Sequence, residues 1–530
     1  MGLKQLVLEF GFWVLFISSI FTNNLVVSSN VDKIQEVITR GNILVDGKNV
    51  IGTTDPNFVC ATLDWWPHDQ CDYGNCSWDQ SSLLNLDLNN KILMNAVKAF
   101  SPLKLRLGGT LQDRLIYETE LQQHCIPFIK NNSNLLGYNQ GCLPLSRWDQ
   151  LNTFFNKSGA VVMFGLNVLN GRFVMRNGSV VGSWNSTNAK SFIEYSLRKG
   201  YKIHGWELGN ELTGTGTAIR IEADQYASDV ISFHNIIQKV YKNEKVKPLI
   251  LAPGGFFNPI WFKEFIHKTT STNIDVVSHH IYNLGPGSDM NLAEKILNPS
   301  LFDHEVVNTF RGMRSVINNS AQVWVGEGGG IYRSGRNQVS NTFLFSFWYL
   351  DQLGLSSSYD TKTYCRQTLI GGNYGLLNTT TFKPNPDYYS ALLWHRLMGN
   401  KVLSTNFSGS NKIRAYAHCS KQSQGGITLL LINMDKMNRV EAKLNAVNGS
   451  ITCRHNGKMT NVREEYRLTA KNGNLQSQSV LLNGKELIVD DEDNIPPMEP
   501  VTVNAEQPIT IAPLSILFAH IPYLCLRACS

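Results

Sequence analysis

Two glutamates, Glu211 and Glu327, stand where a catalytic pair would stand. Each follows a short apolar run and has glycine beside it, in the segments LGNE and GEGGG. Glycoside hydrolysis uses two carboxyl groups: one protonates the leaving oxygen, and the other attacks the sugar or activates water. Most acidic residues are solvated surface charges, and glycine serves tight turns as well as close approach to a ligand. The position of both glutamates at the ends of apolar runs favours catalysis, whereas Glu207, inside its run, is the weaker candidate for the acid.

Other polar residues stand at the ends of neighbouring apolar runs. They are Asp64, Thr110, Asn167, Asn210, and the segment from His279 to Tyr282, which contains His280. If these runs are the parallel strands of one barrel, all their carboxyl ends open onto the same rim, where such a fold builds its active site. We therefore expect these groups to surround the two glutamates.

Eight apolar, β-rich runs alternate with longer amphipathic stretches. The runs are 59–63, 104–107, 161–164, 203–206, 249–252, 274–277, 323–325 and, less regularly, 353–359. Alternating strands and helices indicate a parallel sheet, and eight such units indicate an α/β fold of the (β/α)8 TIM-barrel type. The interval between Glu211 and Glu327 holds three βα units. This places the glutamates after strands 4 and 7, across the barrel mouth from each other.

The composition changes near Gly399, beyond which short alternating runs are separated by Asn-Gly dipeptides. The runs are 413–418, 427–433, 480–482 and 509–521, and Asn-Gly begins at 448, 456, 472 and 483. Asn-Gly favours tight hairpin turns, so this part is predicted to be a C-terminal antiparallel β-sandwich. The predicted domains are a signal peptide at 1–28, N-terminal strands joining the sandwich at 29–54, the barrel at 55–398 and the sandwich at 399–530.

Composition excludes several classes of protein. The 530 residues are 42% hydrophobic and 17% charged, which is too apolar for a disordered chain. The net charge of +6 is spread along the sequence without long basic runs, so nucleic acid is not expected as a partner. The 10 cysteines include no CxxC pair and no zinc spacing, so neither a metal nor another cofactor is expected. Some should form disulfides, but their connectivity cannot be deduced from the sequence.

The N-terminus and the glycosylation acceptors indicate the secretory pathway. Lys4 precedes a short apolar run that ends in small and polar residues, as in a signal peptide; the alternative is a membrane anchor, for which the run is short. No other segment is expected to span a membrane. Acceptor sites for N-glycans, each expected on a surface loop, occur at Asn75, Asn131, Asn156, Asn177, Asn185, Asn318, Asn378, Asn406 and Asn448. We expect a protein secreted to the extracellular space or cell wall, or delivered to a vacuole or lysosome.

Five ordered motifs resemble those of glycoside hydrolase family 79, which contains heparanase and the plant heparanase-like β-glucuronidases such as baicalinase. The motifs are LRLGGT at 105–110, WELGNEL at 206–212, HHIY at 279–282, GGNYGL at 371–376 and PDYY at 386–389. The resemblance is closer to the plant members, covers about residues 59–522, and implies a retaining clan A glycosidase.

The resemblance also implies roles for matching residues. Glu211 would be the acid/base and Glu327 the nucleophile, while Asn210 would bind the sugar 2-hydroxyl and Tyr282 would orient Glu327. Asp64 and Thr110 would lie near the glycone hydroxyls, His280 would contact the ligand, and Tyr374 would hold the uronate carboxylate. Tyr282 and Tyr374 could instead be core aromatics, and His279 is expected to be structural.

Two departures from the family pattern bear on specificity. Heparanase has a run of glycines after the tyrosine of its nucleophile loop, where amide groups meet the uronate; here the segment is Tyr332 to Gly335, and only Gly335 remains. The segment 254–273 also lacks a strongly basic, polymer-binding character, which argues against long sulfated chains. The expected substrate carries a terminal β-linked glucuronic acid. The alternatives are an exo-glycosidase for a neutral sugar and an inactive carbohydrate-binding barrel.

Overall fold

The structure is a computed structural model. It describes residues 37–530 except 121–123, 273, 302, 318–319, 448–453, 456–457 and 460. The predicted signal peptide, and the acceptor residues Asn318 and Asn448, lie outside the described residues. Among the helices of the described part, none has the length and apolar character needed to cross a membrane.

Eight parallel strands close into a barrel, as the alternation of apolar and amphipathic segments predicted. In barrel order the strands are β2 (Val59–Leu63), β3 (Lys104–Leu107), β6 (Val161–Leu166), β9 (Ile203–Leu208), β10 (Leu249–Phe256), β11 (Val276–Ile281), β13 (Gln322–Gly328) and β15 (Thr363–Arg366). Their carboxyl ends share one rim, where the βα loops meet.

The eighth strand was predicted at the wrong place. Residues 353–358 belong to the end of α9 (Phe343–Ser358), Tyr359 caps it, and the strand itself is β15, a few residues further on. Helix α9 is buried on nearly all sides, since it packs against barrel helix α10 (Pro386–Leu397) and against the sheet strands β16 (Met398–Ser408) and β17 (Ile413–Ser420). A helix that is apolar all round shows no amphipathic period, so its sequence could not be distinguished from that of a buried strand.

A helix follows each barrel strand. The helices before α9 and α10 are α2 (Lys91–Lys98), α3 (Leu145–Ser158), α4 (Thr187–Arg198), α5 (Ala223–Val240), α6 (Pro259–Lys268), the short α7 (Leu292–Ile296) and α8 (Asp303–Val316). Local sequence explains where some of them begin. At α6, the Asn258 side chain accepts hydrogen bonds from the N–H groups of Ile260 and Trp261, and Pro259 occupies the first turn.

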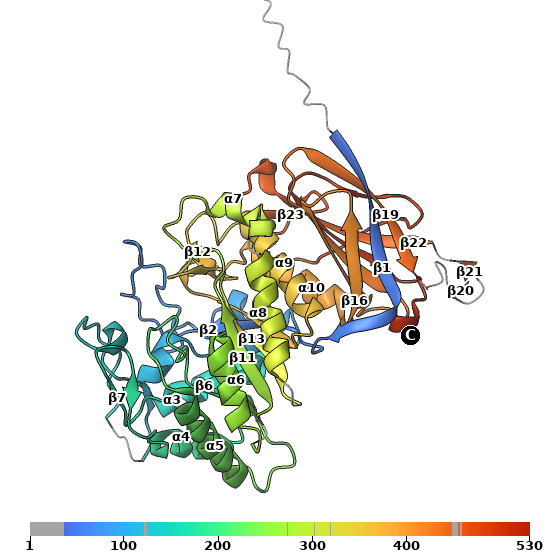
Figure 1. Ribbon diagram of the computed structural model, residues 1–530. Coiled ribbons are helices and arrows are strands. Elements are labelled where there is room, and N and C mark those ends of the chain that lie inside the picture. The colour runs from blue at the N-terminus through green and yellow to red at the C-terminus, as the bar shows by residue number, and fades with distance from the viewer. Residues whose placement is uncertain are drawn as a thin grey trace, which may run out of the picture. The chain divides into compact units, whose positions relative to one another are not determined.

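A second sheet of 11 strands contains the C-terminal residues and one N-terminal strand. Its order is β24 (Lys485–Glu486), β23 (Val480–Leu482), β22 (Val462–Ala470), β27 (Ser515–Ile521), β18 (Ile427–Asn433), β17, β16, β1 (Val37–Thr53), β19 (Asn438–Val447) and β26 (Ile509–Ile511), with β25 (Val501–Asn504) beside β22. Figure 1 shows β1, in blue, lying beside β16 among strands from the other end of the sequence. The predicted single strand 509–521 is two strands, interrupted at Pro513.

The central strands β18 and β27 of this sheet are buried on both faces. Along β18, Leu429 and Leu431 pack into one apolar core with residues of β1, β19 and β26, which is the packing of a sandwich. Leu430 and Ile432, on the opposite face, join the apolar cluster that includes α9 and α10. Because strand side chains alternate between faces, the continuous apolar run of β18 is explained by burial on both sides.

Disulfide bonds link several segments of the fold. The structure shows the pairs Cys60–Cys365, Cys71–Cys76, Cys125–Cys142 and Cys419–Cys529.

Six of the described acceptor asparagines are exposed and Asn378 is half-buried. The expectation of a surface loop is wrong for Asn156, in α3, and for Asn406, in β16.

Candidate active site

Glu211 and Glu327 meet at the mouth of the barrel. Glu211 follows β9 and Glu327 lies near the end of β13, so they come from strands 4 and 7 as predicted. One carboxylate oxygen of each, together with a ring nitrogen of His280, forms a group whose atoms lie within 4.8 Å of one another. Glu211 is 7% exposed and Glu327 is 6% exposed. Two carboxyl groups are therefore held at short range in a nearly dry site.

Glu211 lies in an environment that favours its protonated form. Its backbone N–H donates to the Gly254 carbonyl at 2.7 Å, and one carboxyl oxygen lies 3.0 Å from Nδ1 of His280. Burial raises the pKa of Glu211 to about 7, although the Arg106 guanidinium lowers it. Burial also lowers the pKa of His280 to about 4. The imidazole is neutral near pH 7, so it adds no positive charge that would ionise Glu211.

Glu327 has the opposite environment. The Tyr282 hydroxyl donates to one of its oxygens at 2.5 Å, and Nη1 of Arg106 donates to the other at 2.8 Å. Both oxygens of Glu327 are thus occupied by hydrogen-bond donors, one of them charged. Tyr282 keeps its own proton, because burial and the charge of Glu327 raise the pKa of Tyr282 well above its usual value. Tyr282 and Arg106 therefore fix the Glu327 side chain in place at the barrel mouth.

Arg106, in the middle of β3, connects three residues of the site. Its Nε donates to Glu207 at 2.6 Å, its Nη1 to Glu327, and its Nη2 to the side-chain oxygen of Asn210 at 2.9 Å. The other oxygen of Glu207 accepts from the Ser278 hydroxyl at 2.9 Å, so both oxygens of Glu207 are occupied by protein groups. Glu207 is fully buried and serves as the counter-ion of Arg106, which fits its lower ranking as a candidate acid.

Arg106 was not predicted as a site residue, although the pattern of its strand contained an indication of its role. In Lys104–Leu107 two cations alternate with two leucines, and all four residues are buried. A barrel strand is covered on both faces, so a buried cation must meet an anion inside the barrel. That requirement could have pointed to a carboxylate partner for Arg106.

Asp64 and Tyr374 form another side of the site, joined by Gln367. Nε2 of Gln367 donates to Asp64 at 3.2 Å and lies 3.3 Å from the Tyr374 hydroxyl. Burial and the nearby Glu327 raise the pKa of Asp64 to about 7, so this carboxyl adds little negative charge below that pH. Gln367 follows β15 and was not predicted, because the strand before it was misplaced.

Glycines allow the chain to approach Asp64 and Tyr374 closely. A Cβ on Gly109, whose φ is +112°, would lie 2.4 Å from a carboxyl oxygen of Asp64. The next residue, Thr110, is half-buried and begins the 3-10 turn η1 (Thr110–Arg114). Gly335, with φ of +70°, packs against Tyr374, since a Cβ there would lie 3.0 Å from its ring. Gly335 thus lies beside Tyr374, and Thr110 directly follows the glycine that lies against Asp64.

The backbone of Asn210 is fixed from behind the site. The buried carboxylate of Asp113 accepts the N–H of Asn210 at 2.7 Å and the N–H of Val168 at 2.9 Å. Burial raises the pKa of Asp113 to about 7, while these two N–H donors lower it. Asp113 therefore holds together the loops that follow strands 3 and 4. His279, as expected, is buried in the core, where it packs edge-on against Phe310.

Glu211, His280 and Glu327 are residue types that can bind a metal ion. The surrounding groups, however, favour proton transfer over metal binding. Both oxygens of Glu327 are already used by Tyr282 and Arg106. The guanidinium of Arg106 would also repel a cation placed beside Glu327. The arrangement is suited to one acid and one nucleophilic carboxylate.

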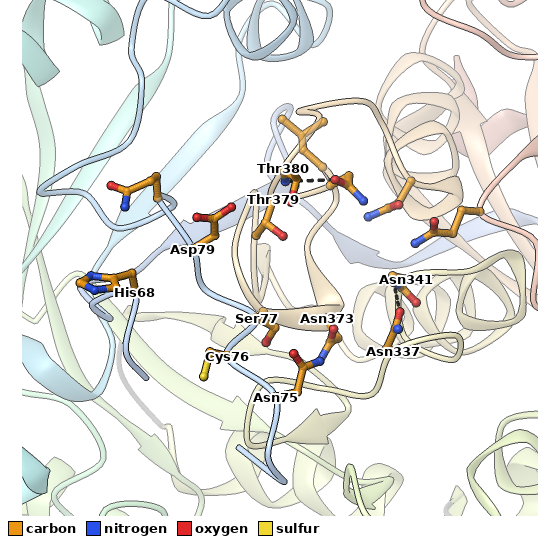
Figure 2. Close-up of a pocket in the computed structure, with 16 residues that line it drawn as sticks. His68, Asn75, Cys76, Ser77, Asp79, Asn337, Asn341, Asn373, Thr379 and Thr380 are labelled. Carbon is orange, nitrogen blue, oxygen red and sulfur yellow. Dashed lines mark hydrogen bonds between the residues drawn. The ribbon is translucent and has the colours of Figure 1, made fainter. Parts of the chain in front are cut away.

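A pocket of about 490 Å³ lies next to the segment that carries Tyr374. It is lined mainly by amide and hydroxyl side chains: Asn75, Ser77, Gln80, Asn337, Asn341, Asn373, Asn378, Thr379, Thr380, Asn385 and Gln478, with His68 and Asp79. Figure 2 shows His68 and Asp79 on one wall and Asn337 and Asn341 on the opposite wall. Glu211 and Glu327 do not line it, and Asn373 directly precedes Tyr374.

Known proteins share the family and the fold of this chain. Residues 40–354 match the model of the family described as glycosyl hydrolase family 79, N-terminal domain. The chain is 55% identical over 511 residues to heparanase-like protein 3 of Arabidopsis thaliana, covering 93% of this chain and 95% of that relative. It is 46% identical over 492 residues to baicalin-β-D-glucuronidase of Scutellaria baicalensis, covering 90% and 91%.

Among solved structures, the fold is similar to that of 4-O-α-L-rhamnosyl-β-D-glucuronidase from Fusarium oxysporum. The TM-score is 0.59 at 17% identity, and the match covers 91% of this chain and all (100%) of that chain. At this identity the likeness shows the shared fold alone.

Proposed function

Because the chain belongs to glycoside hydrolase family 79 and is a glycoside hydrolase, as its motifs predicted, we propose that it is a retaining β-glucuronidase. It would hydrolyse terminal β-linked glucuronic acid from glycoconjugates or small glucuronides. The observation that carries the proposal is the carboxyl pair with opposite environments, one buried beside a neutral imidazole and one bound by Tyr282 and Arg106. The name of the relative from Scutellaria supports the choice of sugar.

The proposed reaction has two steps. In the first, Glu211 gives its proton to the leaving oxygen while Glu327 attacks the anomeric carbon and forms a covalent glycosyl-enzyme. In the second, Glu211 acts as a base and draws a proton from water, which displaces Glu327. Asn210 directly precedes Glu211, and its side-chain oxygen accepts from Arg106, which also binds Glu327, so Asn210 is suited to bind the sugar 2-hydroxyl.

Hydrolysis should proceed with retention of the anomeric configuration. Retaining glycosidases hold their carboxyl groups about 5–5.5 Å apart, whereas inverting enzymes leave about 6.5–9.5 Å for a water molecule. The group of atoms within 4.8 Å favours the shorter class. Proton NMR of the first-formed sugar checks this: a β-anomer is expected from a β-glucuronide, and an initial α-anomer would exclude the double displacement.

The alkaline side of the pH profile should depend on the leaving group. Glu211, whose pKa is raised to about 7, is protonated below that pH and loses its proton above it. We expect kcat/KM for an alkyl glucuronide to fall as pH rises through about 7. An aryl glucuronide with an acidic phenol needs no proton and should lose less.

A comparison of the two substrates isolates Glu211 in that experiment. Asp64 also has its pKa raised to about 7, but its titration acts on the glycone and affects both substrates alike. Equal profiles for the alkyl and aryl substrates would contradict the assignment of the acid.

Recognition of the uronate is assigned to Tyr374 and to the neighbouring backbone. An anion enters a dry site only if donors replace the water that it loses. The Tyr374 hydroxyl stays protonated, because burial raises the pKa of Tyr374 well above its usual value, so it can donate to a carboxylate.

Removal of that hydroxyl should reduce specificity for the uronate. Tyr374→Phe is expected to lower kcat/KM for a glucuronide by about ten- to a hundredfold, the effect of one hydrogen bond to a charged group. The value for the matching glucoside should change much less. An equal loss for both substrates would remove Tyr374 from uronate recognition.

The function is tested by assaying purified protein on paired chromogenic β-glucuronide and β-glucoside substrates. Preferred hydrolysis of the glucuronide is expected. Preference for the glucoside would favour a neutral-sugar exo-glycosidase, and binding without turnover would favour a catalytically inactive carbohydrate-binding barrel.

We also infer entry into the secretory pathway. The disulfides are expected in an oxidising compartment, and exposed acceptor asparagines such as Asn131 and Asn177 are accessible to N-glycans. Mass spectrometry of the mature protein, with and without glycosidase treatment, would test cleavage near residue 28 and occupancy of the acceptors.

A further inference from the structure

Ser334 joins three loops at the wall of the sugar site. Its hydroxyl donates to Asp72 at 2.5 Å and accepts from the indole N–H of Trp78 at 2.9 Å. Its backbone carbonyl accepts the N–H of Asn373 at 2.7 Å. These partners lie in the loops after strands 1 and 8, and Ser334 lies in the loop after strand 7, which also carries Glu327. Ser334 is 5% exposed and Trp78 is 1% exposed, so the bond between them is shielded from water, and the bond to Asp72 is partly buried.

This network holds a backbone conformation that non-glycine residues rarely adopt. The φ angles of Arg333, Ser334 and Gly335 are +56°, +62° and +70°. A positive φ is costly for residues with a side chain and persists where surrounding bonds hold it. Two of these three positions are not glycine. The hydrogen bonds of Ser334 therefore stabilise a turn that glycine would otherwise adopt without strain.

The turn carries free donors beside Tyr374. Within the described residues, the backbone N–H groups of Ser334 and Gly335 donate to no acceptor. Gly335 packs against the Tyr374 ring, and the same ring meets Trp78 edge-on at 6.2 Å. Ser334 therefore holds the turn that carries these amide donors and, through Trp78, is linked to the ring of Tyr374, the residue assigned to the uronate.

We propose that Ser334, with Asp72 and Trp78, is a positioning cluster that sets the specificity of the site for a C5 carboxylate. This rests on the proposed β-glucuronidase function. The cluster does not contact the reacting atoms. It orients the Ser334 and Gly335 amides and the Tyr374 hydroxyl so that they replace the water lost by the uronate.

Replacement of Asp72 can distinguish an effect of its charge from an effect of its position, because the two predict opposite changes in the binding of an anionic sugar. The negative charge of Asp72 contributes to the raised pKa of Tyr374, so it acts on the same hydroxyl. If charge were its main influence, removal of Asp72 would improve the binding of an anionic sugar. If positioning is its role, loss of the acceptor for Ser334 should weaken that binding. Asp72→Asn keeps an acceptor without the charge, whereas Asp72→Ala removes both.

The experiment measures kcat/KM for paired β-glucuronide and β-glucoside substrates with the full-length variants. Ser334→Ala, Asp72→Ala and Trp78→Phe should each lower the glucuronide-to-glucoside ratio about tenfold, the effect of one lost hydrogen bond. Asp72→Asn should keep the ratio or raise it. Ser334→Gly should lower the ratio as Ala does, although glycine relieves the positive φ.

Thr342→Val is the matched control. Thr342 is a fully buried residue of the same loop, and its hydroxyl donates only to the Val339 carbonyl at 2.8 Å. The variant should lower the thermal midpoint to a similar extent and leave the substrate ratio unchanged.

Three outcomes would overturn the positioning role. They are an unchanged ratio in Ser334→Ala, an equal loss for both substrates, and a higher ratio in Asp72→Ala. The wild-type ratio separates this inference from the proposed function: a wild type without preference for the glucuronide contradicts both, whereas a preference that survives in every variant contradicts the positioning role alone.

Discussion

Replacing either glutamate of the pair with glutamine should reduce kcat for an alkyl β-glucuronide by at least about a thousandfold, since each supplies a distinct step. In the proposed mechanism, Glu327→Gln removes the nucleophile, and Glu211→Gln removes the proton donor and the later base. Glutamine has nearly the same shape, so both variants should fold, with thermal midpoints within a few degrees of wild type. The measurements are steady-state kinetics and thermal unfolding of the purified variants.

Azide rescue should then separate the two roles. With Glu211→Ala, azide can attack the glycosyl-enzyme and give a β-glycosyl azide. With Glu327→Ala, azide can occupy the space of the nucleophile and give the α-product, because only one displacement then occurs. The products are assigned by NMR. The reverse pattern would exchange the roles of the two residues.

Glu222→Gln is the control for a glutamate in the loop of Glu211. Its side chain is 62% exposed and pairs with Arg220, so it represents the ordinary surface position of an acidic residue. Its kcat should stay within about twofold of wild type. Retention of activity in either catalytic variant would exclude the assigned mechanism.

The sequence predicted the barrel well where strands and helices differ in period. Seven of the apolar runs lie on or overlap barrel strands, because each is short and is separated from the next by a longer amphipathic stretch. The exception was the last unit. Helix α9 lacks an amphipathic period, and β15 contains Arg366, which the sequence alone would place outside a core. In the structure the Arg366 guanidinium lies over the rings of Phe345, Trp348 and Tyr349 and pairs with Asp387 at 3.2 Å.

The site could be anticipated best where its residues lie at or just beyond the end of a strand. Glu327 lies near the end of β13, and Asn210, Glu211 and Tyr282 come within three residues after strands, so strand order was enough to bring them together. Arg106 lies inside a strand, and Gln367 follows the strand that was misplaced; their roles depend on which side chains meet across the barrel. Such contacts between distant segments have no local pattern in the sequence.

Arg106 is the residue outside the predicted set whose replacement should have the largest effect. It is 1% exposed, and its three nitrogens each bind a different acceptor: Glu207, Glu327 and Asn210. Arg106→Met should lower the free energy of unfolding by about 3–5 kcal/mol, because it leaves buried carboxylates without a counter-ion. Arg106→Lys keeps the charge but not the planar fork, so it cannot make all three bonds. We expect kcat of the lysine variant to fall by about ten- to a hundredfold, the range for lost hydrogen bonds to a charged group.

Lys104→Met separates the loss of stability from the loss of catalysis. Lys104 is a buried residue of the same strand. It pairs with Asp55 at 2.5 Å and lies over the Trp324 ring at 4.5 Å. It makes no contact with Glu211 or Glu327. Thermal unfolding of this variant should show a lower midpoint, while kcat per folded molecule stays close to wild type. If Arg106→Lys and Lys104→Met lose kcat equally, Arg106 only supports the barrel. A loss confined to Arg106→Lys means that the guanidinium holds Glu327 and Asn210 in the geometry that the attack on the anomeric carbon requires.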